Sequence, residues 1–243
     1  MILVIAEKAI AGQRISSILA DKEAPLSMQD GAKSFVFERG GKEFVTVSLK
    51  GHVINVDFPK QYSYWLGTDL KKLVQAEIEY GETEKPILDF LRKIAPEVEK
   101  VIIATDNDRE GESIGFEAIN ALKESNPKIA VKRALFSAII PQDIEAAFDS
   151  LEEVNKNLAD SADSRREVDL VWGAVLTRFL SLVSGRLGKS FLSMGRVQGP
   201  VLALIVDREK ERLAFDPKPY WEIPALFEKD GETFEANNKN GKF

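Results

Sequence analysis

Short apolar runs alternate with amphipathic helical segments over the first 150 residues, and this alternation limits the folds open to the chain. The apolar runs are MILVIA (1–6), VIIAT (101–105) and AVKRALF (130–136). The helical segments after them cover residues 9–20, 110–124 and 141–150. Because strands that alternate with helices pair in parallel, the pattern predicts an α/β fold with a parallel sheet and flanking helices.

Further elements are predicted between and after these segments. Residues 34–49 alternate around Gly40-Gly41, which is a hairpin signal. The other segments are 52–58 (strand-like), 61–80 (aromatic and irregular), 84–95 (helical), 153–184 and 197–213 (helical) and 220–236 (a strand hairpin around Asp230-Gly231). The change from alternation to long helices predicts a boundary near residue 150.

Acidic side chains crowd the ends of two of the predicted strands. VIIAT runs directly into Asp106, Asp108 and Glu110, and MILVIA is followed by Glu7 and a lysine. Ligands of parallel sheets bind beyond the carboxyl ends of the strands, so these groups are expected to converge at one edge. Carboxylates that close together are unfavourable unless a cation compensates them.

Magnesium is the cation that suits this set. Mg²⁺ prefers carboxylate oxygens and keeps waters and a phosphate oxygen among its ligands. Glu7, Asp106, Asp108 and Glu110 are the candidate ligands, Glu7 is also available for proton transfer, and Lys8 offers a positive charge to a phosphate. The alternative is a capped helix start whose acids are simply solvated.

The composition of the chain excludes disulfides and several kinds of metal site. The chain has no cysteine and a single histidine, so disulfides and thiolate or histidine zinc clusters are excluded. The start is unlike a signal peptide, and no run approaches the roughly 20 apolar residues of a membrane span. Net charge is −6, but residues 161–213 hold nine Lys and Arg against six Asp and Glu, a balance of +3. That segment is either a phosphate site or ordinary surface scatter.

The glutamate after the first strand and the two aspartates after a later one resemble the Toprim domain of topoisomerases, bacterial-type primases and some nucleases. Four other stretches narrow the resemblance, and with ATDNDREGESIGFEAI they occur in a fixed order. They are IAEKAIAGQRIS, SLKGHVINVDFP, ADSRREVDLVWGAVLTRFLS and LSMGRVQGPVLALIVDREKERLAFDPKPYWEI. Together they resemble the N-terminal part of a type IA DNA topoisomerase of the archaeal topoisomerase I or topoisomerase III-like kind.

The resemblance implies three regions. Residues 1–150 would be a Toprim (Rossmann-like) catalytic domain that binds Mg²⁺. Residues 151–215 would be a helical domain that binds single-stranded DNA, and residues 216–243 the first strands of a β-rich arch domain.

Site residues carry over from the same motifs. Glu7 and Lys8 would act at the scissile phosphate, and Asp106, Asp108 and Glu110 would hold the metal. The residues implied in DNA binding are Arg165, Arg166, Asp169, Thr177, Arg178, Ser193, Arg196 and Gln198. His52 lies in the family's GH motif, where an internal hydrogen bond and a DNA contact are both open. Arginines pair well with phosphates, and base stacking is open to Trp172 or Phe179, although an apolar helical stretch favours core packing of Trp172.

The resemblance also implies a reaction: Mg²⁺-dependent, ATP-independent breakage of one DNA strand, strand passage and rejoining through a 5′-phosphotyrosine. None of the four tyrosines matches the family's nucleophile motif, so the chain is expected to be a fragment that is inactive alone. Its expected partners are single-stranded or negatively supercoiled DNA and the remaining C-terminal part of the enzyme, without membrane or ATP, in a cytoplasmic, nucleoid-associated setting. No GxxxxGK[ST] phosphate loop is present.

Three alternatives remain on the sequence alone. The chain could be the topoisomerase portion of a reverse gyrase, a Toprim nuclease or primase, or a DNA-binding module without catalysis. Toprim nucleases and primases lack the RRxxD and GRVQ segments that occur here.

Overall fold

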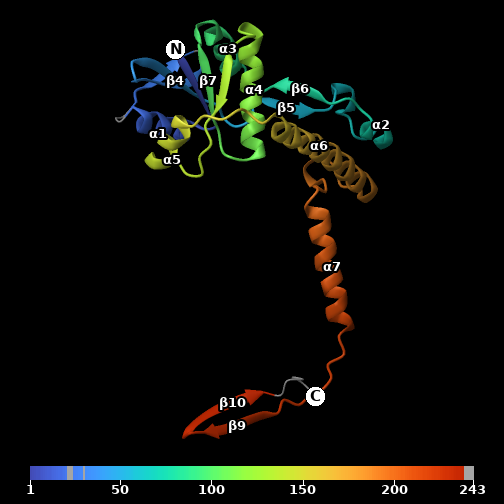
Figure 1. Cartoon of the computed structure of the whole chain (residues 1–243). Coiled ribbons are helices and arrows are strands. Elements are labelled where there is room, and N and C mark those ends of the chain that lie inside the picture. The colour runs from blue at the N-terminus through green and yellow to red at the C-terminus, as the bar shows by residue number, and fades with distance from the viewer. Residues whose placement is uncertain (21–23, 30, 238–243) are drawn as a thin grey trace. The chain divides into compact units, whose positions relative to one another are not determined.

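The first part of the computed structural model is built on a six-stranded sheet with the order β2-β3-β4-β1-β7-β8 (Figure 1). The structure describes residues 1–20, 24–29 and 31–237. They fall into two compact units, Met1–Gly195 and Arg196–Phe243. The strands of the sheet are β1 (Ile2–Ala6), β2 (Leu26–Gln29), β3 (Ala32–Arg39), β4 (Lys42–Ser48), β7 (Lys100–Ala104) and β8 (Ala130–Arg133).

The sheet is mixed and not wholly parallel. Strands β4, β1, β7 and β8 run parallel, as predicted, but β3 pairs antiparallel with both β4 and β2. The cause is the turn at Gly40-Gly41, where φ is 58° and 73°. Two residues with positive φ form the tight turn that joins antiparallel strands, whereas parallel strands need a long crossover.

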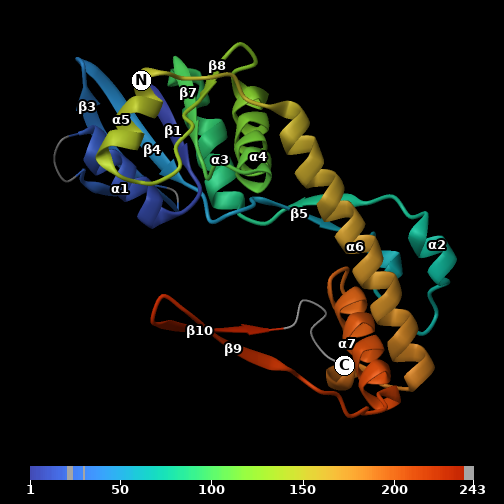
Figure 2. The same ribbon diagram turned by 60° about the horizontal axis from the view of Figure 1, so that its bottom comes forward.

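Helices cover both faces of this sheet. One core cluster packs the sheet against α3 (Lys85–Ile94) and α4 (Arg109–Ser125), and the other packs it against α1 (Ala9–Leu19) and α5 (Pro141–Asp149). Figure 2 shows the two helix pairs on opposite sides of the strands. Successive side chains of β1 enter alternate clusters, as expected for a strand buried on both faces. The predicted three-layer α/β arrangement is confirmed.

A small hairpin and a long helix complete the first unit. Strands β5 (Ile54–Asp57) and β6 (Glu79–Glu82) pair antiparallel, and the helical turns η1 (Lys60–Tyr62) and α2 (Leu70–Val74) lie between them. Helix α6 (Lys156–Ser184) has 29 residues, is capped by the Asn155 side chain, and ends at Gly185 with φ 67°. The sequence predicted α6 but not β2, α2 or β6.

The elements of the second unit follow the sequence prediction closely, whereas two short turns of the first unit were not predicted. These turns are η2 (Ala95–Glu97) and η3 (Gly188–Ser190). The second unit holds α7 (Gln198–Ala214) and the hairpin of β9 (Pro224–Lys229) and β10 (Glu232–Asn237), with positive φ at Asp230 and Gly231. The predicted domain limits at 150 and 215 stay predictions.

None of the helices in the described ranges is long and apolar enough to cross a membrane.

Candidate active site

The carboxyl ends of β1 and β7 lie side by side and bring the predicted acids together. The two strands pair in parallel with Ala6 opposite Ala104. Glu7 follows β1 by one residue and Asp106 follows β7 by two, so the two side chains lie near each other and the charge of Glu7 acts on the Asp106 carboxyl. The Glu7 side chain is only 12% exposed and lies 2.8 Å from Lys8 Nζ. The spacing of the motifs thus places these three side chains in one cluster.

The closeness of these groups shifts the pKa values of Asp106 and Lys8. Burial, and then the negative charge of Glu7, raise the pKa of the Asp106 carboxyl, with Lys8 opposing. The pKa of the Lys8 ammonium is raised by the hydrogen bond and charge of Glu7, with contributions from Asp106 and Asp108. Two carboxylates held together without full compensation form a site that favours an added cation.

The loop that carries the aspartates is locked by the start of α4. Asp108 is the N-cap of this helix, and its Oδ1 accepts a 2.7 Å hydrogen bond from the Gly111 N–H. Thr105 Oγ1 donates to the Gly111 carbonyl at 2.6 Å. A Cβ at position 111 would lie 2.1 Å from the Asp106 carbonyl oxygen, so only glycine allows this approach.

A buried arginine that the sequence reading missed supports the same loop. The Arg133 guanidinium is buried and donates to the carbonyls of Ile103, Thr105, Ala134 and Asp106 at 2.8–3.1 Å. Its Nε also pairs with the buried Glu112 at 2.8 Å. The residue lies in the predicted strand run AVKRALF next to Lys132, where a basic residue indicates a solvated side chain and nothing about its partners.

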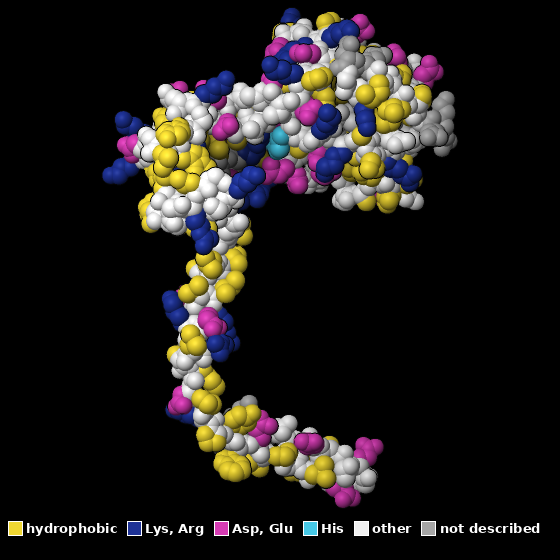
Figure 3. Space-filling model, turned by 180° about the vertical axis from the view of Figure 1, so that it is seen from behind, with side chains coloured by type: hydrophobic (Ala, Val, Ile, Leu, Met, Phe, Trp, Pro, Cys, Tyr) yellow, Lys and Arg dark blue, Asp and Glu magenta, His cyan; other side chains and the backbone are white. Residues whose placement is uncertain are grey.

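Glu110 belongs to a second cluster of polar side chains. Its carboxylate lies 3.3 Å from His52 Nε2 and 3.6 Å from Arg165 NH1. His52 Nδ1 lies 2.7 Å from Glu117 Oε1, and Glu117 also accepts hydrogen bonds from the Val53 and Ile54 N–H groups. Figure 3 shows the histidine at the surface among acidic and basic side chains. The sequence left an internal hydrogen bond and a DNA contact open for His52, and the structure contains the internal hydrogen bond.

Arg166 belongs to this second cluster as well. Its NH1 lies 2.7 Å from Glu117 Oε1, and its NH2 donates to the Ile54 carbonyl. Burial would raise the pKa of Glu117, but the hydrogen bond and charge of His52 and the two backbone N–H groups lower it overall. Burial lowers the pKa of His52, yet Glu117 outweighs it and the net shift is upward.

The residues implied in DNA binding differ in how accessible they are. Arg165 is 38% exposed and also pairs with Asp169 at 3.6 Å. Arg178 is 8% exposed, donates to the Tyr62 carbonyl at 2.6 Å and covers the Trp65 ring, and burial lowers its pKa. The Thr177 hydroxyl accepts from the Met194 N–H at 2.9 Å.

The predicted GRVQ loop spans the border of the two units. Ser193 is exposed and belongs to the first unit, and Arg196 and Gln198 are exposed and belong to the second. Helix α7 begins at Gln198, as the sequence predicted for the helix after this loop. The DNA contacts of these residues stay predictions.

The donor chemistry of the β1–β7 edge fits Mg²⁺, although the ligands are not gathered in advance. Among the residues that the structure describes, no three His, Cys, Asp or Glu side chains form a metal-ligating group. Mg²⁺ usually takes one or two protein carboxylates and completes its shell with water and phosphate. The Glu7–Asp106 pair and the free oxygen of the Asp108 cap match that requirement.

Two known protein families match separate parts of this chain. Residues 2–139 match the Toprim domain, and residues 153–243 match a family described as DNA topoisomerase. DNA topoisomerase 1 of Thermoplasma acidophilum is 45% identical over 95% of this chain, and that of Archaeoglobus fulgidus is 45% identical over 93%.

More distant relatives that match this chain also carry the name topoisomerase. DNA topoisomerase 3-alpha of Drosophila melanogaster is 34% identical over 96% of this chain. Among solved structures, full-length topoisomerase I from Thermotoga maritima matches 99% of the chain with a TM-score of 0.64 and 28% identity, and the match covers 35% of that protein. The chain covers 30% and 34% of the Thermoplasma and Archaeoglobus relatives, or about a third of their length.

Proposed function

Because the chain belongs to the type IA DNA topoisomerase family and carries its Toprim domain, we propose that it supplies the metal-binding and single-strand-binding part of such an enzyme. The reaction of the whole enzyme would be ATP-independent breakage, passage and rejoining of one DNA strand. The observation that carries the proposal is the parallel pairing of β1 and β7, which brings Glu7 and Asp106 to the same edge of the sheet, with Lys8 paired to Glu7 at 2.8 Å.

Each residue of the pair has a distinct role in this proposal. Glu7 lies at the end of β1 with its side chain 12% exposed and paired with Lys8, and its proposed role is to assist proton transfer to the leaving 3′ oxygen. Lys8 is exposed enough to meet a phosphate oxygen. Asp106 and Asp108 would hold Mg²⁺, which when bound supplies positive charge to the scissile phosphate.

The nucleophile of the reaction is proposed to come from outside this chain. Its tyrosines are Tyr62, Tyr64, Tyr80 and Tyr220. Tyr80 donates its hydroxyl to Glu167, which raises its pKa to about 12, the opposite of what an activated nucleophile needs.

Metal binding is the first test. We expect Mn²⁺ or Mg²⁺ to bind the chain, measured by calorimetry, and to bind much more weakly to Asp106→Asn and Asp108→Asn. Glu43→Gln, which removes an exposed carboxylate of β4, is the matched control and should bind as the unmodified chain does. Equal affinity in all four proteins would refute the proposed site.

Strand binding is the second test. If exposed arginines such as Arg165 and Arg196 meet phosphates, affinity for single-stranded DNA should fall steeply as salt rises. Arg165→Gln should lower both the affinity and the slope of that dependence. A flat salt response would contradict a phosphate-lined path.

Catalysis is the third test. We expect the chain alone to leave negatively supercoiled plasmid unchanged, and relaxation to appear when the remaining segment of a relative such as the Thermoplasma enzyme is added. Glu7→Ala should abolish that relaxation. Relaxation by the chain alone would show that one of its own tyrosines is the nucleophile.

A further inference from the structure

An aromatic pocket lies in the first unit, lined by two segments that are far apart in the sequence. It has a volume of about 410 Å³. Its walls are residues 63–66, which follow η1, and Leu187, Gly188 and Phe191, which follow the C-terminal end of α6. Neither segment contains a residue of the acidic cluster at the β1–β7 edge.

The aromatic rings of the pocket are held in place and yet open to solvent. Trp65 and Phe191 meet edge to face with their centres 5.8 Å apart. The Arg178 guanidinium lies 5.6 Å from the centre of the Trp65 ring and is itself anchored on the Tyr62 carbonyl. Tyr64 is 67% exposed and Phe191 is 46% exposed. A fixed, exposed aromatic cluster is typical of a binding surface.

The two segments that line the pocket carry basic residues and no acid. No aspartate or glutamate occurs between Asp169 and Asp207, and the part of that stretch in the first unit holds three cations: Arg178, Arg186 and Lys189. Residues 58–68 also lack acids and contain one lysine. In a chain of net charge −6, two acid-free segments that meet at one pocket indicate a polyanionic partner.

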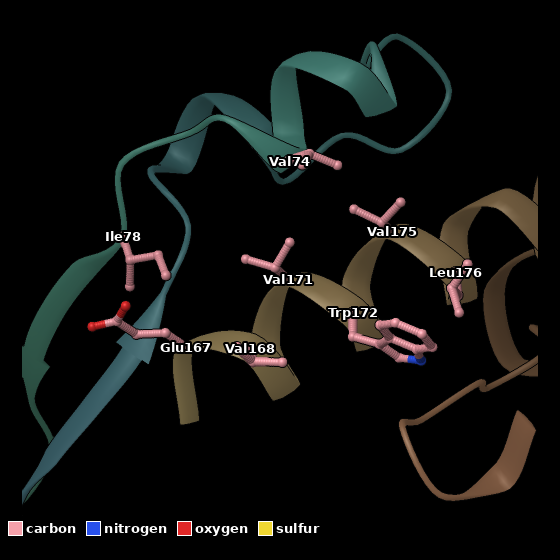
Figure 4. A pocket seen from close by; sticks show the side chains of 8 residues that line it. All are labelled: Val74, Ile78, Glu167, Val168, Val171, Trp172, Val175 and Leu176. Carbon is pink, nitrogen blue, oxygen red and sulfur yellow. The ribbon is translucent and has the colours of Figure 1, made fainter. Parts of the chain in front are cut away.

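The groove between α2 and α6 differs in this respect. It is lined by Val74, Ile78, Glu167, Val168, Val171, Trp172, Val175 and Leu176 (Figure 4). Its single charged lining residue is acidic, so it offers no charge complementarity to a phosphate backbone. Trp172 is 44% exposed here, so the expected core packing of this residue is incomplete, but it faces an apolar, slightly acidic surface.

We infer that the pocket of Tyr64, Trp65 and Phe191 is a base-stacking subsite that takes an unpaired base of a DNA strand. Aromatic rings accept any base by stacking, and adjacent cations follow the phosphates. Arg186 and Lys189 are exposed in the segment that leads to Phe191, and they are the cations that we expect to meet the adjacent phosphates. This inference rests on the proposed binding of single-stranded DNA and adds where one base is held.

The test compares an intact oligodeoxythymidine with the same strand carrying abasic sites, using fluorescence anisotropy on the whole chain. Stacking on a protein ring is worth roughly 1–3 kcal/mol per base, or about 5- to 150-fold in affinity. The unmodified chain should therefore prefer the intact strand. Tyr64→Ala combined with Phe191→Ala should lose about tenfold in affinity for it and bind both strands alike. The salt dependence should not change, because no charge is removed.

Matched variants separate stacking from other effects. Phe227→Ala, which removes a ring of β9 that is 48% exposed, close to the 46% of Phe191, should bind like the unmodified chain. Tyr64→Phe with Phe191→Tyr keeps both rings and should retain the preference for the intact strand. A further variant replaces Trp172 and Trp221 with phenylalanine and leaves Trp65 as the one tryptophan. Its fluorescence should be quenched by the intact strand only, which tests the pocket while its own rings remain in place.

Two outcomes overturn the inference and are distinguishable from each other. If the alanine variant still prefers the intact strand as strongly as the unmodified chain, DNA is bound but not in this pocket. If the unmodified chain binds neither strand, the proposed DNA-binding function fails together with the subsite.

Discussion

His52 is the only histidine of the chain, so its protonation can be followed as a single NMR signal. Burial lowers its pKa, but the hydrogen bond and charge of Glu117 raise it above 6.5 overall. We expect a titration midpoint above 6.5 in the unmodified chain and a lower midpoint in Glu117→Gln, where Glu110 is the remaining group that opposes burial. Glu124→Gln, on the same helix but paired with Arg92, should leave the midpoint unchanged.

The same shift predicts how stability depends on pH. The folded chain holds the His52 proton more tightly than the unfolded chain does. The stabilisation is therefore complete below pH 6.5 and is lost as pH rises through the folded-state pKa. Urea unfolding should show this decline above pH 6.5, and His52→Gln should abolish it. A chain whose stability rises over this window would contradict the Glu117 contact.

A further prediction about a single residue concerns the buried Arg133. Arg133→Met removes the hydrogen bonds to four carbonyls and leaves Glu112 buried without its partner. We expect a loss of about 3–5 kcal/mol in the free energy of unfolding, measured in urea. Adding Glu112→Gln should recover part of it, because the uncompensated charge is gone. A loss below about 1 kcal/mol would mean that the network is not stabilising.

Residues were predictable where their role followed from position along the chain. Glu7 and Asp106 each follow an apolar run, and parallel pairing alone brings such positions together. Arg133 and Glu117 were not predictable, because their roles depend on burial and on partners 21 to 65 residues away in sequence. Tyr64 and Phe191 were missed for the same reason: their two segments meet only in the folded chain.

At the scale of elements, the start of α4 is the most constrained point. Gly111→Ala would place a methyl group 2.1 Å from the Asp106 carbonyl, a backbone atom that cannot move aside cheaply. We expect a loss of about 1–3 kcal/mol, as for other overpacked sites, together with weaker Mn²⁺ binding. Gly173→Ala is the matched control in α6. Nothing lies within 4 Å of its added carbon, so it should be neutral or stabilise by up to about 1 kcal/mol.

Elements with a clear period were predicted, and those without one were not. Helices α3, α4 and α6 have strong start signals or long apolar periodicity, and they lie within a few residues of their predicted bounds. Strand β6 and helix α2 have four and five residues in an aromatic, irregular stretch, too short to show a period. Strand β8 ends at Arg133, three residues before the predicted end. The apolar residues that follow it, such as Phe136, are buried but lie outside the strand.

At the scale of the whole molecule, the cores lie within the first unit. Both clusters of buried apolar residues fall between Ile2 and Ala147, and no residue of α7 is buried. A chain truncated after Gly195 should therefore unfold cooperatively with a urea midpoint close to that of the full chain. A large drop in the midpoint, measured by circular dichroism, would show that the second unit contributes to the stability of the first.

Helix α6 is continuous between two of the features described above. Arg165, which pairs with Glu110, and Arg178, which fixes Trp65, are both on it. Thirteen residues separate them, or about 20 Å at 1.5 Å per residue. The helix thus fixes both the spacing and the relative orientation of these two contacts. One residue inserted between the arginines would rotate the far end of the helix by about 100° and turn Arg178 away from Trp65, whereas a whole extra turn would restore its orientation and increase the spacing by about 5.4 Å.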